Sequence, residues 1–394
     1  MKILHTVQLY SPSVGGMQEV VKQISERLVL LGHEVYVATT KLQERNDSVI
    51  NGVNVISFNV QGNLAHGMTG DINEYKEFVF NGDFDIVTNF AAQQWATDAI
   101  IAELGNIKVP KVFVPTGFSG LFDSRYSQYF ESMKTWMKGY DMNVFLSDDY
   151  RDINFARENG VKNITLVPNG ASEEEFLPSS ESDDLIRCQL GIPPNNLLIL
   201  VVGSHTGLKG HAEATKIFGK SRLKNATMLI VGNSSGGGCT RSCGWRKFFF
   251  DKWPFYNLQG KQLLVMELSR EQTVSAYKSA DIFLFPSNIE CSPLVLFEAL
   301  ASKTPFLTTD VGNAAEIIQW SHGGDLLPTF IDKKGCSRAK IKESVLVLER
   351  LVQNASTQNE MKKLGFEAWK KEFTWGGITL RYEKLYQGLI QKRR

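Results

Sequence analysis

The chain has 394 residues, of which 43% are hydrophobic and 22% are charged; this composition is typical of a globular protein and excludes a disordered one. A chain of this length is too long for one ordinary hydrophobic core, so we expect two domains of roughly 150–200 residues each. Its 43 basic and 42 acidic residues almost cancel, so we expect no nucleic acid partner.

The first residues, MKILHTVQLYSPS, are too short and too polar for a secretory signal, and no apolar run approaches about 18 residues. We therefore expect a cytoplasmic protein, and contact with the inner face of a membrane stays open. Five cysteines in a chain of this size argue against a disulfide framework. Cys239 and Cys243 form a C-x3-C pair, but no second cysteine pair or close histidine completes a zinc set, so we predict no metal site.

The first half of the chain alternates strand-like and helix-like segments. Residues 2–7 predict a strand, a turn rich in Ser, Pro and Gly leads to Gly15 and Gly16, and a helix follows with Gly32 as its stop. Such alternation predicts an α/β domain with a parallel sheet covered on both faces. Ligands of these sheets bind beyond the carboxyl ends of the strands, which is where Gly15 and Gly16 lie. Further strands are predicted at 35–39, 53–58, 86–89, 112–115 and 143–147.

A second series of the same kind occupies the other half. The segment ITLVPNGASEEEF predicts a last strand and an exit, and the acidic, Ser-rich sequence after it predicts an interdomain linker near 172–190. We thus expect an N-terminal Rossmann-like domain at 1–172, a C-terminal one at 173–374, and an amphipathic helix at 375–394 that crosses back to the first domain. Strands of the second domain are predicted at 197–202, 226–232, 263–267, 282–285 and 305–309, with an irregular insertion at 233–260.

The stretch from Phe285 to Pro305 organises the second half. Ser292 and Pro293 predict the N-cap and first turn of a helix that is apolar on nearly every side. Glu298 lies inside that helix, and Glu290 lies eight residues before it. A carboxylate in such a place is costly unless something pairs with it, and a ligand rich in hydroxyls would do so. Free backbone N–H groups at the start of the helix would suit an anion.

These features together resemble the family 4 glycosyltransferases of the GT-B fold, in which two Rossmann-like domains face a central cleft. The resemblance implies a retaining, metal-independent hexosyltransferase that needs no cofactor. Its donor would be a nucleotide-diphosphate sugar and its acceptor a saccharide or lipid-linked molecule, in surface polysaccharide or glycolipid synthesis. The motifs follow the family's order over almost the whole chain: Gly15-Gly16, VPNGASEEEF, VVGSHTGLKGH, PSNIECSPLVLFEALASKTPF with its E-x7-E element, and VGNAAEII.

The same resemblance implies roles for individual residues. Lys209, in a Gly-flanked loop, would contact phosphate, and Glu290 would contact hydroxyls of the transferred sugar; these two are the predicted catalytic residues. Glu298 would accept hydrogen bonds from the ribose. Gly15 and Gly16 would let the backbone approach the diphosphate or the acceptor closely. The other predicted donor-binding positions are Gly203, Ser204, Gly210, Cys291, Ser292 and Leu294.

Three positions depart from the family's pattern. Ser204 stands where relatives carry an Arg, so a bidentate clamp on the diphosphate is missing. Pro293, between the two acids, has no N–H to donate. Thr116 stands where many relatives place a His, and His5 lies too early in the chain to replace it. Two other functions therefore stay open: a non-catalytic nucleotide-sugar-binding partner subunit, and a nucleotide-sugar epimerase or hydrolase on the same scaffold.

Three further segments have more than one interpretation. Asp83-Phe84-Asp85 has the D-x-D spacing of metal–diphosphate sites, but it lies just before a strand, where Asp commonly makes turns, and we predict no metal there. Residues 125–140 form an amphipathic helix that could rest in a membrane interface or pack in the core. The basic and aromatic segment at 239–256 could be a lid, a membrane contact or ordinary packing.

Overall fold

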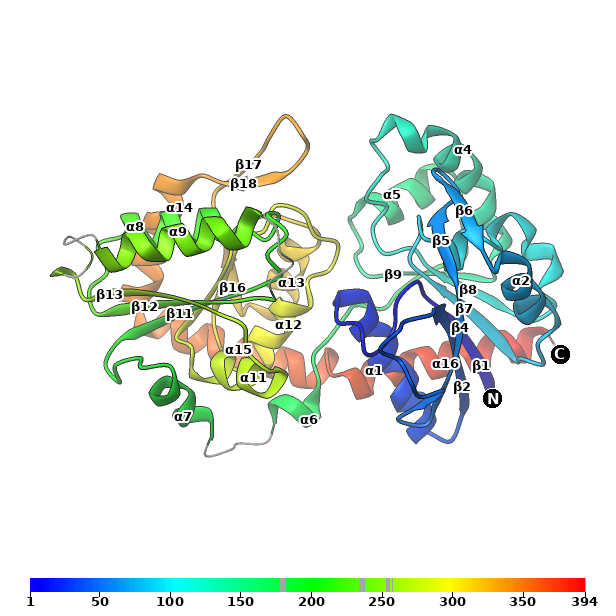
Figure 1. Ribbon diagram of the computed structural model, residues 1–394, viewed down its shortest axis with the longest axis horizontal. Coiled ribbons are helices and arrows are strands. Elements are labelled where there is room, and N and C mark those ends of the chain that lie inside the picture. Colours follow the sequence, from blue (N-terminus) through cyan, green and yellow to red (C-terminus); the bar gives the residue numbers. More distant parts are fainter. Residues whose placement is uncertain (178–181, 234–237, 253–255, 257, 394) are drawn as a thin grey trace. The chain divides into compact units, whose positions relative to one another are not determined.

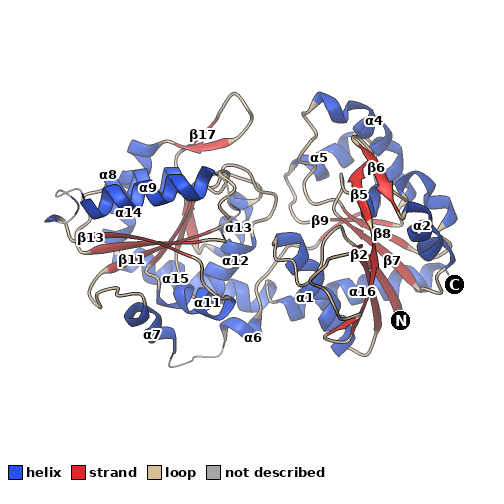
Figure 2. Ribbon diagram, in the orientation of Figure 1, coloured by secondary structure: helices blue, strands red, loops and turns tan. Residues whose placement is uncertain are grey.

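The computed structural model describes residues 1–177, 182–233, 238–252, 256 and 258–393 (Figure 1). The chain divides into two compact units: unit 1 comprises Met1–Asn169 and Trp375–Arg394, and unit 2 comprises Gly170–Thr374. The sequence predicted a domain boundary after residue 172, and the structure divides the chain slightly earlier, after Asn169. Both units are α/β with a mainly parallel sheet (Figure 2), which confirms the predicted fold class.

Unit 1 is built on an eight-stranded sheet in the order β10-β9-β8-β7-β1-β2-β4-β3, parallel throughout except for the β3–β4 pair. The central strand β7 is buried along its whole length, as expected where helices cover both faces of a sheet. Its strands are β1 (Lys2–Thr6), β2 (Glu34–Thr40), β3 (Val49–Ile50), β4 (Val53–Phe58), β7 (Ile86–Phe90), β8 (Lys111–Val114), β9 (Met142–Phe145) and β10 (Ile164–Leu166). A separate antiparallel pair is formed by β5 (Val60–Asn63) and β6 (Gly67–Gly70).

The helices of unit 1 include the last helix of the chain. This helix, α16, packs against α1, and the Tyr386 hydroxyl on it accepts from Thr88 at 2.8 Å and lies 3.1 Å from Nε2 of His5. All three residues are completely buried, so the C-terminal helix is part of the core of unit 1. The helices are α1 (Gly16–Leu30), α2 (Ile72–Asn81), α3 (Trp95–Asp98), α4 (Ser127–Trp136), α5 (Arg151–Glu158) and α16 (Trp375–Arg393), with 3-10 turns at Ile101–Asn106, Ser124–Tyr126 and Met137–Gly139.

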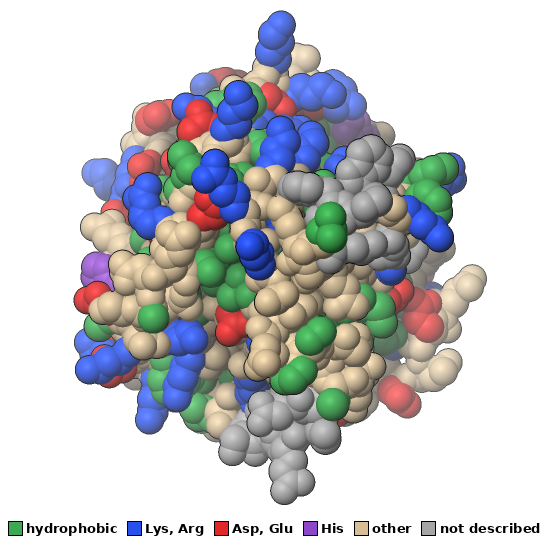
Figure 3. All heavy atoms as spheres, turned by 90° about the vertical axis from the view of Figure 1, so that its left-hand side faces the viewer, with side chains coloured by type: hydrophobic (Ala, Val, Ile, Leu, Met, Phe, Trp, Pro, Cys, Tyr) green, Lys and Arg blue, Asp and Glu red, His purple; other side chains and the backbone are tan. Residues whose placement is uncertain are grey.

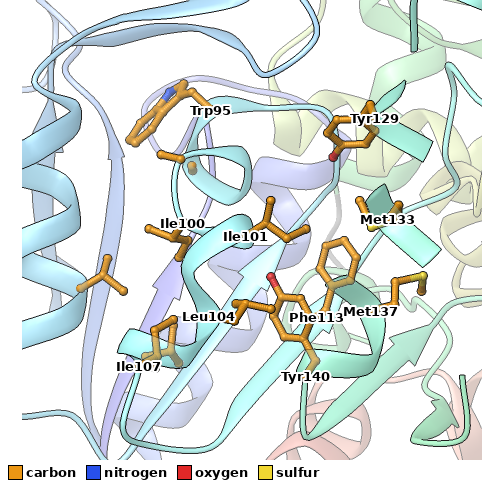
Figure 4. Close-up of a cluster of buried hydrophobic side chains, with 14 of the residues drawn as sticks. Trp95, Ile100, Ile101, Leu104, Ile107, Phe113, Tyr129, Met133, Met137 and Tyr140 are labelled. Carbon is orange, nitrogen blue, oxygen red and sulfur yellow. The ribbon is translucent and has the colours of Figure 1, made fainter. Parts of the chain in front are cut away.

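The amphipathic segment at 125–140 belongs to the core of unit 1. Figure 4 shows Tyr129, Met133 and Met137 pointing into a cluster that also holds Phe113 and Trp95. Each of these side chains is at most 5% exposed. These side chains are therefore already buried against protein, whereas Trp136 is only partly buried, and this favours the interpretation that the segment packs in the core. Among the described helices of the chain, none is long and apolar enough to cross a bilayer.

Unit 2 is built on a six-stranded parallel sheet in the order β13-β12-β11-β14-β15-β16. An antiparallel hairpin of β17 and β18 lies apart from it. The strands are β11 (Leu197–Val202), β12 (Ala226–Val231), β13 (Lys261–Met266), β14 (Ile282–Phe285), β15 (Phe306–Thr308), β16 (Gly324–Leu326), β17 (Thr329–Ile331) and β18 (Ser337–Ala339). The helices are α6 (Glu173–Phe176), α7 (Ser182–Gln189), α8 (His211–Lys220), α9 (Gly238–Lys252), α11 (Arg270–Ser279), α12 (Leu294–Ala301), α13 (Ala314–Ser321), α14 (Ile341–Gln353) and α15 (Ala355–Glu372).

Side chains of successive residues in β11 and β14 point into two separate apolar cores, because side chains alternate between the two faces of a strand. One core packs beneath α11, α12 and α15, and the other beneath α8 and α14. This explains why both strands read as unbroken apolar runs in the sequence. The first core takes Leu198, Leu200, Phe283 and Phe285, and the second takes Ile199, Val201, Ile282 and Leu284.

Two sequence predictions about unit 2 were wrong. The expected linker near 172–190 contains α6 and α7, and Arg187 of α7 pairs with Asp281 at 3.0 Å, so this segment is part of the unit. The expected irregular insertion at 233–260 contains the fifteen-residue helix α9. The acidic composition of the first segment and the aromatic composition of the second suggested loops. Helices α7 and α9 are instead stabilised by contacts with residues that are distant in sequence. Residues 178–181 of the linker, and Trp253 of the insertion, lie outside the described residues.

Helix α9 divides its aromatic side chains between core and surface. Phe250 is buried and stacks on Phe218 at a centroid distance of 5.7 Å. Trp245 and Phe248 are 65% and 51% exposed and line a shallow pocket with Arg241. On the face of unit 2 seen in Figure 3, Lys and Arg side chains are spread among neutral and apolar ones rather than gathered in one patch.

Candidate functional site

The candidate site of unit 2 is formed by two loops that follow neighbouring strands. Because β11 and β14 are adjacent and parallel, the loops at 203–210 and 286–293 leave the sheet at the same edge. The Asn288 amide donates to the Leu208 carbonyl at 2.8 Å and joins them. Gly210 has a φ of +69°, and a Cβ there would lie 1.8 Å from the Pro286 carbonyl oxygen. Glycine is therefore required at this position for the loops to pack.

Lys209 and Glu290, the predicted catalytic residues, are brought together by these loops. The Nζ of Lys209 lies 2.6 Å from Oε1 of Glu290, and the Ser287 hydroxyl donates to the same oxygen at 2.7 Å. The Lys209 and Glu290 side chains are 29% and 12% exposed. Both side chains are partly buried, so the pair is stronger than the about 0–1 kcal/mol of a fully exposed one. A ligand that offers an anion to the lysine and hydroxyls to the carboxylate can replace the contact without leaving either charge unpaired.

Gly203 and Ser204 lie in the same loop. The Gly203 amide donates to the Val231 carbonyl at 2.9 Å. A Cβ at Gly203 would lie 3.0 Å from Cβ of Lys209, so the glycine lets the lysine side chain lie close against the backbone. The Ser204 carbonyl accepts from the Thr206 amide at 2.7 Å. Both predicted residues thus help shape the loop that presents Lys209.

Glu298 lies on α12 with its side chain only 10% exposed, and it is paired within the chain. Its Oε1 lies 2.6 Å from Nη1 of Arg270 on α11. The same guanidinium donates to both carboxylate oxygens of Glu175, at 3.0 and 2.7 Å. Burial alone would lower the pKa of Arg270, but the charges of Glu298 and Glu175 outweigh it and raise that pKa above its ordinary value.

Arg270 and Glu175 were not predicted from the sequence. A carboxylate on an apolar helix indicated a missing cation, but the partner was taken to be a ligand, whereas Arg270 already balances the charge of Glu298. Burial and the charge of Glu298 raise the pKa of Tyr277, also on α11, well above its usual value, so its hydroxyl stays neutral beside the carboxylate. Contact between Glu298 and a ribose stays a prediction.

The start of α12 differs from the sequence prediction. The helix begins at Leu294 with Pro293 at its N-cap and no side-chain hydrogen bond to cap it, so Ser292 is not the N-cap. The Cys291 carbonyl accepts from the Asn313 amide at 2.8 Å, which ties this turn to the loop before α13. The positions predicted to bind the donor through their backbone, Cys291, Ser292 and Leu294, therefore lie together between the two glutamates.

Gly15 and Gly16 lie in unit 1, at the start of α1. Gly15 has extended backbone, with a φ of 178°, which any residue adopts. A Cβ at Gly16 would meet nothing within 4 Å, and one at Gly15 would meet the flexible Gln18 side chain. Packing among the described residues therefore does not require glycine at position 16. The close approach of a ligand to this backbone remains the predicted reason for the glycine.

The carboxyl edge of the unit 1 sheet holds strained backbone that the sequence did not reveal. After β7, Ala91 and Gln93 have φ values of +63° and +61°, and after the adjacent β8, Thr116 and Phe118 have +61° and +47°. Left-handed conformations in non-glycine residues cost of order 1–3 kcal/mol each and gather at functional sites. The side-chain oxygen of Gln93 accepts from the Gly120 amide at 3.1 Å and joins the two loops. Thr116 thus lies in a candidate site although it is not the expected His.

His5 and the D-x-D segment have structural roles in unit 1. His5 is completely buried and its Nδ1 lies 2.8 Å from the Ser25 hydroxyl. The carboxylate of Asp85 accepts from the Lys2 amide at 2.7 Å, and the Asp85 amide donates to the Lys2 carbonyl at 2.8 Å, so Asp85 joins the entry into β7 to the start of β1. Among the described residues, metal-type ligands do gather elsewhere: His205 and His211 lie beside Cys239 and Cys243, so folding supplies the histidines that the sequence around the two cysteines lacked.

Comparisons with known proteins match both halves of the chain. The family model described as Glycosyltransferase Family 4 matches residues 14–175, and the model described as Glycosyl transferases group 1 matches residues 182–361. An uncharacterized glycosyltransferase of Methanocaldococcus jannaschii is 26% identical over 344 residues, which cover 82% of this chain and 84% of the relative.

Two further similarities are informative. The alpha-galactosylglucosyldiacylglycerol synthase of Streptococcus pneumoniae is 24% identical over 184 residues, covering 46% of this chain and 45% of the synthase. The crystal structure of Anabaena HepE in complex with UDP-glucose superposes with a TM-score of 0.74 over 98% of this chain and all of that chain, at 14% identity. At that identity the structural likeness shows the fold alone.

Proposed function

Because the chain belongs to the GT-B glycosyltransferases, with a family 4 N-terminal half and a group 1 C-terminal half, we propose that it transfers a hexose-type sugar from a nucleotide-diphosphate sugar to a saccharide or lipid-linked acceptor with retention of the anomeric configuration. The observation that carries this proposal is the Lys209–Glu290 pair, presented by two loops at one edge of the unit 2 sheet.

On donor binding, Lys209 and Glu290 would separate, and each would contact a different part of the donor: Lys209 the diphosphate and Glu290 the sugar. Negative charge grows on the leaving phosphate as the bond from the sugar C1 to the phosphate oxygen breaks. Lys209, fixed in its loop before the reaction, would stabilise that charge, and prearranged electrostatics of this kind usually supply the largest part of an enzyme's rate gain. Glu290 would accept hydrogen bonds from hydroxyls of the sugar and hold C1 towards the acceptor.

In the proposed reaction the acceptor oxygen bonds to C1 on the face from which the phosphate leaves. The acceptor proton passes to the leaving phosphate oxygen, so atoms and charge balance without a protein base. This agrees with Thr116, which carries no group able to act as a general base at neutral pH, where many relatives have a His. The products are a nucleoside diphosphate and a glycoside with the donor's anomeric configuration.

For the nucleotide, Glu298 is the proposed ribose acceptor. One of its oxygens lies on Arg270, and a carboxylate has lone pairs for further donors on both oxygens. UDP-glucose is the first donor to test, because the similar Anabaena protein holds it in its crystal structure. A lipid-linked acceptor is suggested by the Streptococcus pneumoniae relative, whose name describes a diacylglycerol glycolipid synthase.

The test combines binding with product analysis. Thermal unfolding is followed against a panel of nucleotide-sugars, since a ligand that binds only the folded state raises the melting temperature. The donor that responds is then incubated with glucosyldiacylglycerol and with oligosaccharide acceptors, and NMR of the glycoside gives its anomeric configuration. If no nucleotide-sugar shifts the melting temperature, or the product is inverted, the proposal is wrong.

A second candidate function is non-catalytic binding of a nucleotide-sugar. It is favoured by Ser204, at a position where the resemblance to the family leads us to expect an Arg that clamps the diphosphate. Such a protein would show the thermal shift but would release no nucleoside diphosphate with any acceptor. Turnover, measured as nucleoside diphosphate release that depends on the acceptor, separates the two functions.

A further inference from the structure

Two thiols and two imidazoles meet in unit 2, beside the loop that carries Lys209. His205 comes from that loop, His211 begins α8, and Cys239 and Cys243 come from α9. One ligand atom from each residue lies within 4.8 Å of the ligand atoms of all the others. The Sγ of Cys239 lies 3.6 Å from Nδ1 of His205 and 3.5 Å from Nδ1 of His211.

The arrangement follows from how the segments pack. Residues four apart lie on the same face of a helix, so the C-x3-C spacing directs both thiols of α9 to one side. That side faces α8, against which α9 packs (Figure 1), and the Phe218–Phe250 stack joins the two helices further along. The centroids of the two histidine rings lie 4.6 Å apart. In the sequence, His205 precedes Gly210, the last residue of the loop, and His211 follows it.

The distances are those of a tetrahedral metal site. Zinc binds thiolate sulfur at about 2.3 Å and imidazole nitrogen at about 2.0–2.1 Å, so neighbouring sulfur and nitrogen ligands of a tetrahedral zinc lie roughly 3.6 Å apart. The two Cys239 distances, 3.6 and 3.5 Å, agree with that value. Two thiolates and two imidazoles without a carboxylate are the ligands of structural zinc, and they are not those of magnesium or calcium.

We propose that His205, His211, Cys239 and Cys243 bind one zinc ion in a closed, four-coordinate structural site. Three of the four residues are buried, and both cysteines are free thiols rather than a disulfide. On binding, the two thiols lose their protons to solvent, and the two thiolates neutralise the charge of Zn²⁺. All four positions of a tetrahedral ion are then filled by protein, which leaves none for a substrate.

The zinc ion would fasten α9 to the loop at 203–210. Lys209 lies between the two histidine ligands in sequence, so the metal would hold the loop on both sides of it. This consequence rests on the proposed function: loss of zinc should weaken donor binding because Lys209 is less well fixed. The site itself does not depend on the donor, and its presence is measured without one.

The primary experiment is elemental analysis of the full chain purified without a polyhistidine tag. We expect one zinc ion per chain in the wild type and in Cys188→Ser, which changes an exposed cysteine on α7. Cys239→Ser and Cys243→Ser should lose most of the metal. Cys243 is buried, so its variant could fail to fold, and a second measurement on the wild-type chain covers that case.

In that second measurement, zinc is removed with a chelator and Co²⁺ is added. A tetrahedral site with two thiolates gives intense visible d–d bands and thiolate-to-cobalt charge-transfer bands in the near ultraviolet, and binding releases two protons per ion. The proposal is overturned if the wild type holds no more zinc than the Cys239→Ser variant, or if cobalt gives no thiolate bands. Discovery of a Cys239–Cys243 disulfide in the freshly purified chain would also overturn it. Because neither measurement uses a nucleotide-sugar, its outcome is independent of the proposed function.

Discussion

Replacing Arg270 by methionine tests whether the charge of Glu298 is balanced inside the chain. The guanidinium bridges Glu298 and Glu175, and its removal leaves a carboxylate with a side chain 10% exposed without its cation. Breaking a fully buried pair costs about 3–5 kcal/mol. Because the Arg270 side chain is 42% exposed, water screens part of this, and we expect a loss of about 1–3 kcal/mol in the free energy of unfolding.

The assay is urea unfolding of Arg270→Met, of Glu298→Gln and of the double variant. The double variant should recover most of the loss, since a neutral amide no longer needs the cation, and the cycle then gives the coupling energy of the pair. Arg125→Met is the matched control: that arginine also pairs with a carboxylate, Asp123, but its side chain is 71% exposed, and we expect no measurable change. If Arg270→Met is as stable as the control, or the double variant recovers nothing, the ion pair does not balance Glu298.

Three further predictions concern Glu298, Lys209 and His5. Glu298→Gln should leave stability nearly unchanged but weaken nucleotide-sugar binding about tenfold, the effect of losing a charged hydrogen-bond acceptor, as measured by calorimetry; an unchanged Kd would exclude the ribose role. Lys209→Ala should lower the turnover number by about 10²–10³ if it stabilises the leaving phosphate, whereas Lys216→Ala, at an exposed position of α8, should not. Burial lowers the pKa of His5 to about 3, so below about pH 6.5 the unfolded chain binds a proton at this residue that the folded chain does not. His5 alone should therefore destabilise the fold by about 2 kcal/mol at pH 5 and not at all above about pH 7. The difference between the urea midpoints of wild type and His5→Asn, measured against pH, should show this contribution, because buried groups such as Asp98 and His211 titrate alike in both chains.

The fold could be predicted from local patterns because the central strands of both sheets are buried on both faces. Runs such as Leu197–Val202 and Ile282–Phe285 are apolar throughout, and in a parallel sheet every residue of such a run has a core to enter. The alternation of strands and helices then predicts a parallel sheet, because parallel neighbours need a crossover connection that is usually a helix, but it does not give the order of the strands. The two predicted catalytic residues follow from the same rule, since both lie after strands that turn out to be neighbours in the sheet.

The missed features all depend on partners that are far away in sequence. Arg270 reaches Glu175 and Glu298 only after α6, α11 and α12 have packed. The helix at 238–252 reads as an irregular insertion because its aromatic and basic residues show no clear amphipathic period, and its burial comes from contact with β13 and α8. No spacing rule within the insertion could have indicated the histidines beside Cys239 and Cys243, because they belong to another loop.

If the chain transfers a sugar as proposed, the loop at 203–210 would let the site work without the arginine that the resemblance to the family leads us to expect at Ser204. A cation stabilises a developing charge in proportion to how well it is held in place beforehand, because no energy is then spent on reorienting it during the reaction. This loop is held at Gly210 by the close approach to Pro286 and at Leu208 by the Asn288 amide, and the proposed zinc ion would hold it at His205 and His211. We therefore expect a lysine held at these points to compensate in part for the missing arginine. On this argument, removing zinc should lower the turnover number of the wild type but have little further effect on Lys209→Ala, and equal losses in both would show that the metal acts on something other than the lysine.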